Sequence, residues 1–153
     1  LPDSLEAKTE PHFASAKNIL SQMINPMKVE SDLKSAHKKI EFMIPNFALG
    51  MTLDNSFIII DEAQTLNPVI MKLLLERIGK NSKVVVLGDP SQVYSSTLDR
   101  QGMRDAIHKF FKVDGKEVKE PYYKNIGYFK FEATDCVRSD IVRTVLQAYS
   151  EDR

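Results

Sequence analysis

Two short apolar runs, separated by a segment with helical spacing, place the strongest constraint on the fold. The runs cover residues 57–60 and 83–87. Neither has a polar face, which is typical of parallel strands that are buried on both sides. Between them, Pro68 suits the first turn of a helix and Gly79 is placed to end it. A strand, a helix and a second strand form a βαβ unit, normally right-handed and parallel, and therefore predict an α/β fold.

The spacing of apolar residues predicts further elements on both sides of this unit. Helices are expected at residues 11–23, 102–111 and 140–149, and another begins with Ser31 as its cap. The helix at residues 140–149 is expected to turn its apolar residues inward. Short strands are expected at residues 40–44 and 128–131, and the Asp114-Gly115 pair predicts a hairpin turn.

Composition narrows the functional classes. The chain has 21 basic and 21 acidic residues, so it has no overall attraction for nucleic acid or an anionic membrane. The single cysteine, Cys136, excludes an internal disulfide framework and fits a reducing, cytoplasmic compartment. We expect neither a membrane span nor a signal peptide, because no apolar stretch is long enough for the first. The 3 histidines are far apart in sequence, which argues against a zinc site.

The polar residues that can perform chemistry follow the two apolar runs. Asp61 and Glu62 end the first run, and Asp89 and Gln92 follow the second. Ligands of open α/β sheets bind beyond the carboxyl ends of the strands. There, one carboxylate can hold Mg²⁺ through water while its neighbour orients an attacking water. Gln92 is suited to hydrogen-bond a γ-phosphate or that water, and Gln64 is expected to face the same crevice.

A structural interpretation of the two carboxylates stands beside the catalytic one. Acidic residues near a helix start are stabilised by the helix dipole, so Asp61 and Glu62 can simply cap the helix that follows. The second strand end, Gly88-Asp89-x-x-Gln92, favours the catalytic interpretation. The phosphate loop Gly-x-x-x-x-Gly-Lys-Ser/Thr, however, does not occur in these residues. We therefore expect residues 1–153 to form a single ATPase domain that is incomplete at its N-terminus.

Several motifs, in order, carry a family resemblance. They are Ile60-Asp61-Glu62-Ala63-Gln64, Pro68, Met71-Lys72, Arg77-Ile78-Gly79, Ser82-Lys83, Gly88-Asp89, Gln92 and Asp135-Cys136-Val137-Arg138. Together they resemble the core of PhoH-type ATPases. That family is related to superfamily 1 helicases, whose motifs II and III read Asp-Glu-x-Gln and Gly-Asp-x-x-Gln. The resemblance covers nearly the whole chain, apart from an apparent insertion at residues 112–126.

The resemblance implies a P-loop NTPase core of the RecA type, with a mostly parallel sheet flanked by helices and truncated at the N-terminus. It also implies binding and hydrolysis of ATP with Mg²⁺. Asp61 would hold the metal through water, Glu62 would be the catalytic base and Gln92 would sense the γ-phosphate. Arg138 would act as an arginine finger, in its own subunit or a neighbour's. Gln64 and Asp89 would complete the nucleotide-binding set.

The resemblance further implies RNA or single-stranded nucleic acid as a partner, and a ring-shaped homo-oligomer. The chain departs from the family where Leu49 and Met51 replace arginines that flank a glycine, which puts a nucleic-acid or phosphate contact in doubt. Arg138 also has a plainer interpretation as a surface ion pair with Asp135 or Asp140.

Two other functions remain open at this point. The chain can be the first motor domain of a superfamily 1 helicase, which predicts a second RecA-like domain downstream and strand unwinding. It can also be a degenerate, non-catalytic interaction module that kept the fold and lost its nucleotide site.

Overall fold

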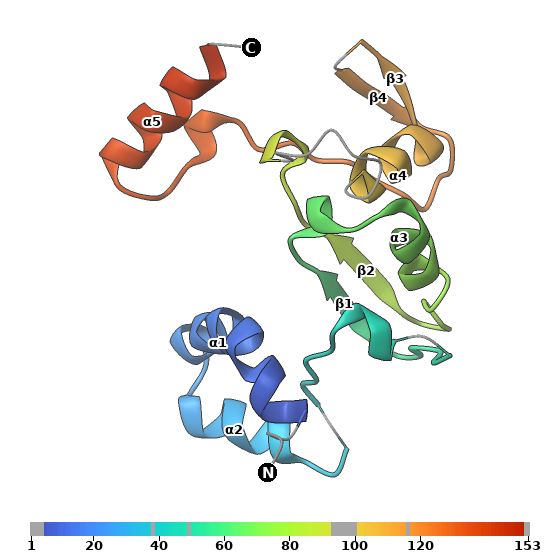
Figure 1. The fold of residues 1–153 in the computed structure, drawn as a ribbon, viewed down its shortest axis with the longest axis vertical. Coiled ribbons are helices and arrows are strands. Elements are labelled where there is room, and N and C mark those ends of the chain that lie inside the picture. Colours follow the sequence, from blue (N-terminus) through green and yellow to red (C-terminus); the bar gives the residue numbers. More distant parts are fainter. Residues whose placement is uncertain (1–4, 38, 49, 93–100, 116, 152–153) are drawn as a thin grey trace.

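The computed structural model describes residues 5–37, 39–48, 50–92, 101–115 and 117–151. The helices are α1 (Leu5–Met23), α2 (Pro26–Lys34), α3 (Pro68–Leu75), α4 (Gly102–Phe110) and α5 (Asp140–Glu151). The strands are β1 (Phe57–Ile60), β2 (Lys83–Val86), β3 (Phe111–Asp114) and β4 (Glu117–Pro121). Figure 1 shows α1 and α2 at one end, β1, β2 and α3 in the middle, and the β3–β4 hairpin and α5 at the other end.

The central pair of strands confirms the predicted βαβ unit. β1 and β2 are parallel, in a register that runs from Phe57 opposite Lys83 to Ile60 opposite Val86. The helix α3 connects them, as its apolar spacing and Pro68 indicate. The chain is therefore a mixed α/β protein with a small parallel sheet, and the carboxyl ends of both strands meet at one edge.

A dense set of hydrogen bonds fixes this register at the opposite edge of the sheet. The N–H of Leu53 donates to the carbonyl of Arg77 at 2.8 Å, and the N–H of Gly79 returns a bond to Leu53 O at 3.0 Å. The hydroxyl of Ser82 also donates to Leu53 O, at 2.6 Å. Because a shift of one residue would turn every side chain of a strand to the other face, these bonds help to set which residues reach the functional edge.

Burial of the strands differs from the prediction. We expected both faces to be covered, but Phe57 and Ile59 are 67% and 59% exposed, whereas Ile58 and Ile60 on the opposite face are half-buried. Exposure alternates in the same way along β2. A strand whose residues are all apolar needs a packing layer on each side. The described residues provide that layer on one side only.

The start of α2 also differs from the prediction. The side chain of Asn25 accepts the N–H of Met27 at 2.9 Å, and Pro26 lies in the first turn. Asn25 is therefore the cap, and Ser31 lies inside the helix. Proline interrupts a helix that precedes it. It suits the first turn of the next helix, because the N–H that proline lacks would have no partner in that turn.

Neither of the short strands expected at residues 40–44 and 128–131 forms. A strand needs a neighbour for its backbone hydrogen bonds, and alternating apolar residues alone do not supply one. In the second segment the rings of Phe129 and Phe131 instead contact each other, with their centroids 4.9 Å apart. The predicted hairpin turn is confirmed, since β3 and β4 pair in antiparallel fashion around Gly115, whose φ is +59°.

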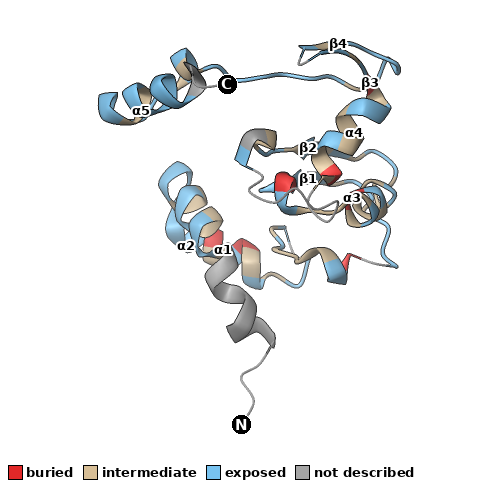
Figure 2. Cartoon of the chain, turned by 45° about the horizontal axis from the view of Figure 1, so that its top comes forward, coloured by how far each residue is buried: buried red, intermediate tan, exposed pale blue. Residues whose placement is uncertain are grey.

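The C-terminal helix forms where it was predicted, but its apolar residues are not turned inward. Ile141, Leu146 and Tyr149 are all exposed. Figure 2 shows α5 and the hairpin mostly exposed, whereas buried segments lie close to β1 and at the start of α4. Amphipathic spacing therefore identified the helix correctly, but the described residues leave its apolar stripe uncovered.

Gly102, the first residue of α4, generates a test of this packing. Its N–H donates to Leu66 O at 2.8 Å, and a Cβ there would lie 2.6 Å from Asn67 O. The atoms that a Cβ would meet, Asn67 O and Leu66 O, belong to the backbone and cannot move aside as a flexible side chain can. We therefore expect Gly102→Ala to lower the free energy of unfolding by about 1–3 kcal/mol in chemical denaturation.

The matched control is Gly127→Ala, because nothing lies within 4 Å of a Cβ at Gly127. Its unfolding free energy should stay within about 0.5 kcal/mol of the wild-type value. Equal effects of the two substitutions would contradict the close contact between α4 and the start of α3.

Candidate functional site

The chain leaves the first strand through a sharp turn that carries both carboxylates. Asp61 follows β1 and its Oδ1 accepts the N–H of Glu62 at 2.9 Å. Glu62 has a left-handed backbone, with φ 51° and ψ 36°. A non-glycine residue costs about 1–2 kcal/mol in that region, and such strain concentrates at functional sites. Both side chains are exposed, so both can reach a ligand from solvent.

Backbone pairing continues past the strands and draws the two strand ends together. The N–H of Leu87 donates to Ile60 O at 2.8 Å, and the N–H of Ala63 donates to Leu87 O at 2.9 Å. These bonds place the turn at residues 61–64 directly beside residues 87–89. The juxtaposition that the sequence predicted for the carboxyl ends of adjacent parallel strands is therefore present.

Gln64 connects the two strand ends through its side chain. It is only 5% exposed. Its Nε2 donates to Glu62 Oε2 at 2.6 Å, and its Oε1 accepts the N–H of Asp89 at 3.2 Å. Sequence reasoning expected Gln64 to face the crevice as part of the nucleotide-binding set, and that role stays a prediction. In the structure each polar end of its side chain makes a hydrogen bond within the protein.

Gln92 completes the group from the loop after β2. Its Nε2 donates to Asp89 Oδ2 at 3.0 Å, while its side chain remains exposed. Arg104, on α4, donates to Pro90 O at 2.8 Å and so ties this loop to the helix. Sequence reasoning missed Arg104, because an arginine on the polar side of an amphipathic helix carries no motif.

Arg138 is the one predicted site residue that does not join this group. It is exposed and lies in the segment before α5, and among the hydrogen bonds and ion pairs of the described residues none joins it to residues 61–64 or 88–92. The ion pair in that region is formed by Arg143, whose guanidinium lies 3.5 Å from Asp140 and also donates to Cys136 O. Both roles considered for Arg138 stay predictions.

The donors at the strand ends fit one kind of metal binding. Within the described residues there is no group of three or more histidine, cysteine, aspartate or glutamate side chains that could hold a metal ion. Asp61 and Glu62 are instead two adjacent exposed carboxylates. Mg²⁺ often binds through one or two carboxylates, waters and substrate phosphates. The arrangement is therefore of the kind that suits a metal arriving with a phosphorylated ligand.

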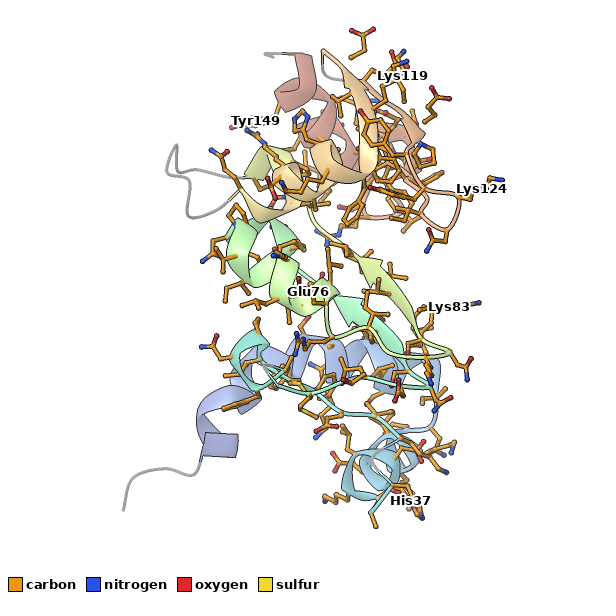
Figure 3. The ribbon with its side chains drawn as sticks, turned by 90° about the vertical axis from the view of Figure 1, so that its right-hand side faces the viewer. His37, Glu76, Lys83, Lys119, Lys124 and Tyr149 are labelled. Atoms are coloured by element: carbon orange, nitrogen blue, oxygen red, sulfur yellow. The ribbon has the colours of Figure 1, made fainter. Side chains whose placement is uncertain are left out.

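Charged side chains elsewhere on the surface are largely balanced. Figure 3 shows Lys119 and Lys124 at the hairpin end of the molecule, away from the central strands. Lys119 pairs with Glu117, and Lys112 lies 3.8 Å from Glu120.

Among the helices that the structure describes, none combines the length and the apolar character needed to cross a membrane.

Comparison with known proteins places the chain among relatives of one kind. A family model described as "PhoH-like protein" matches residues 1–150. Protein PhoH of Escherichia coli K12 is 29% identical over 150 residues, which cover 98% of this chain and 40% of that protein. The PhoH-like protein of Mycobacterium leprae is 31% identical over 99% of this chain and 40% of its own length. That of Synechocystis is 29% identical over 97% and 42%. The chain thus spans about two fifths of these curated relatives.

The geometry allows the helix-capping interpretation of the two carboxylates to be tested. In the structure α3 is capped by Asn67, whose Oδ1 accepts the N–H of Ile70 at 2.8 Å. We expect Asn67→Ala to lower the free energy of unfolding by about 1 kcal/mol, because the cap bond is lost.

Asp61→Ala is the comparison, and it should change the unfolding free energy by less than about 0.5 kcal/mol, as for an exposed residue outside a cap. Urea denaturation of both variants measures this. A larger loss for Asp61→Ala than for Asn67→Ala would favour the capping role.

Proposed function

The chain belongs to the PhoH-like protein family, and from this premise we propose that it binds ATP and supplies the carboxylate side of a Mg²⁺-dependent hydrolysis site. The observation that carries the proposal is the meeting of two parallel strand ends, one bearing Asp61 and Glu62 and the other leading to Asp89 and Gln92. In P-loop NTPases, such an edge receives the phosphates of the nucleotide.

The proposed roles follow from exposure and hydrogen bonding. Asp61, exposed at the end of β1, is the protein contact for Mg²⁺, which neutralises charge on the phosphates. Glu62 accepts a bond from Gln64 through Oε2, which leaves Oε1 to orient the attacking water and take its proton. Gln92, exposed on the neighbouring loop, is placed to hydrogen-bond the γ-phosphate.

A complete site needs contributions that lie outside this group of residues. The 153 residues contain no Gly-x-x-x-x-Gly-Lys-Ser/Thr loop, so other polypeptide supplies the lysine that holds the phosphates. Arg138, which is exposed before α5, is proposed to act as an arginine finger in its own subunit or on the site of a neighbouring copy, as in a ring-shaped homo-oligomer.

RNA or single-stranded nucleic acid is the proposed partner of the ATPase. Tyr122, Tyr123 and Phe129 have exposed rings, which are the kind of side chain on which bases stack. Lys124 lies in the same segment. The neighbouring lysines are paired with glutamates, so stacking contributes more to this contact than phosphate attraction does.

The direct test is Glu62→Gln in the whole protein, including any residues that flank these 153. We expect kcat for ATP hydrolysis to fall by about 100-fold or more while the Kd for ATP changes by less than about threefold, since only the base is removed. Steady-state phosphate release and equilibrium nucleotide binding measure the two quantities.

Glu76→Gln is the matched control. Glu76 is an exposed glutamate that follows α3 and pairs with Lys72 at 3.6 Å, and its replacement should leave kcat unchanged. An unchanged kcat in Glu62→Gln would overturn the assignment of the base.

Two outcomes would select the other functions. ATP-driven separation of a duplex, together with a second RecA-like domain, would identify a superfamily 1 helicase. Absence of ATP binding by the whole protein would identify a non-catalytic interaction module.

A further inference from the structure

We propose that Gln64 is a positioning residue that joins the catalytic base on the first strand to the phosphate-sensing loop after the second. The inference rests on the proposed function for the roles of Glu62 and Gln92. It differs from the expectation that Gln64 binds the nucleotide, because both polar ends of this side chain are already engaged and the residue is 5% exposed.

The two ends of the carboxamide have opposite hydrogen-bonding character, and the site requires both. At one end Nε2 donates to the carboxylate of Glu62 at 2.6 Å. At the other, Oε1 accepts the backbone N–H of Asp89 at 3.2 Å. Turning the amide over would set an oxygen against the carboxylate and a donor against an N–H. A glutamate has no donor for Glu62, and an asparagine is one methylene shorter.

The connection continues from Asp89 to the sensing residue. The carboxylate of Asp89 accepts from Gln92 Nε2 at 3.0 Å, and its carbonyl accepts from Gln92 N–H at 3.0 Å. A hydrogen-bonded path therefore runs from Glu62 through Gln64 and Asp89 to Gln92. A displacement of either strand end is transmitted to the other through this path.

Gly88 gives independent support for the placement of Gln64. A Cβ on Gly88 would lie 2.5 Å from Gln64 Oε1 and 3.1 Å from the backbone N of Ala63. Real Cβ atoms essentially never come within 3.0 Å of such an atom, and Met103 Sδ would also lie at 2.9 Å, so the space beside Gly88 is occupied by the side chains of Gln64 and Met103. The glycine that ends the second strand and the glutamine that follows the first are thus parts of one arrangement.

The connection also bears on the strained turn. Glu62 has a left-handed backbone, φ 51°, whose cost the surrounding contacts must offset. The bond from Gln64 holds the Glu62 carboxylate through Oε2, and the side chain remains exposed. Removing the bond should therefore misplace the base without removing a contact to the nucleotide.

Two substitutions in the whole protein separate the two bonds. Gln64→Glu keeps an oxygen for the Asp89 N–H, but it loses the donor to Glu62 and sets a second carboxylate against it. Gln64→Met has a similar length and loses both hydrogen bonds without adding charge. We expect each to lower kcat by about tenfold or more, because small misplacements of a catalytic group are costly. The Kd for a fluorescent ATP analogue should change by less than about threefold, since uniform binding is kept.

Hydrogen–deuterium exchange of the peptide that covers residues 87–92 supplies a second readout. Exchange should be faster than in the wild type in Gln64→Met, where the Asp89 N–H has lost its Gln64 acceptor. It should be slower in Gln64→Glu than in Gln64→Met, because the glutamate keeps an acceptor oxygen. Gln101→Glu, the same chemical change at a residue outside the path, is the control and should behave as the wild type in both measurements.

Wild-type kcat in both Gln64 variants, or a raised Kd with unchanged kcat, would overturn the positioning role. The second result would make Gln64 a nucleotide contact. If the wild-type protein does not hydrolyse ATP, the proposed function fails by itself. The exchange measurement then still decides whether Gln64 joins the strand ends, and equal exchange in the wild type and Gln64→Met would show that it does not.

Discussion

The parallel pairing of β1 with β2 is the constraint on which the rest of the site depends. It sets Ile60 opposite Val86, and the bonds beyond it, from Leu87 to Ile60 and from Ala63 to Leu87, bring the two turns side by side. Were the register one residue different, the carboxylates would be displaced along the sheet relative to Asp89. Every later feature, including the contact between Gln64 and Asp89, follows from this pairing.

Side chains at the two adjacent strand ends then form the candidate site. The left-handed turn at Glu62 exposes both carboxylates, and Gln64 fills the space that Gly88 leaves open. The cap of α3 is Asn67, whose Oδ1 accepts the N–H of Ile70. The carboxylates of Asp61 and Glu62 instead accept bonds within their own turn, and the strained backbone at Glu62 agrees with a site shaped for a ligand.

Much of this arrangement could be predicted from the sequence, because its signals are local. The apolar runs at residues 57–60 and 83–87, Pro68 and the Asp114-Gly115 pair each act within a few residues, and each produced the expected element. The meeting of the strand ends followed from parallel topology alone. What was not predictable depends on distant partners. Whether Phe57 is covered, or residues 128–131 find a neighbouring strand, is decided by other parts of the structure. The buried placement of Gln64 likewise depends on Gly88, a glycine that follows another strand.

The central claim is that ATP binds where these two strands end. A crystal structure of the whole protein with Mg²⁺ and a non-hydrolysable ATP analogue tests it most directly. We expect the phosphates to lie at the carboxyl ends of β1 and β2. The metal should lie beside Asp61 and the γ-phosphate within hydrogen-bond reach of Gln92, with Gln64 out of contact with the nucleotide. Phosphates bound at any other part of the chain, with the strand ends facing only solvent, would contradict it.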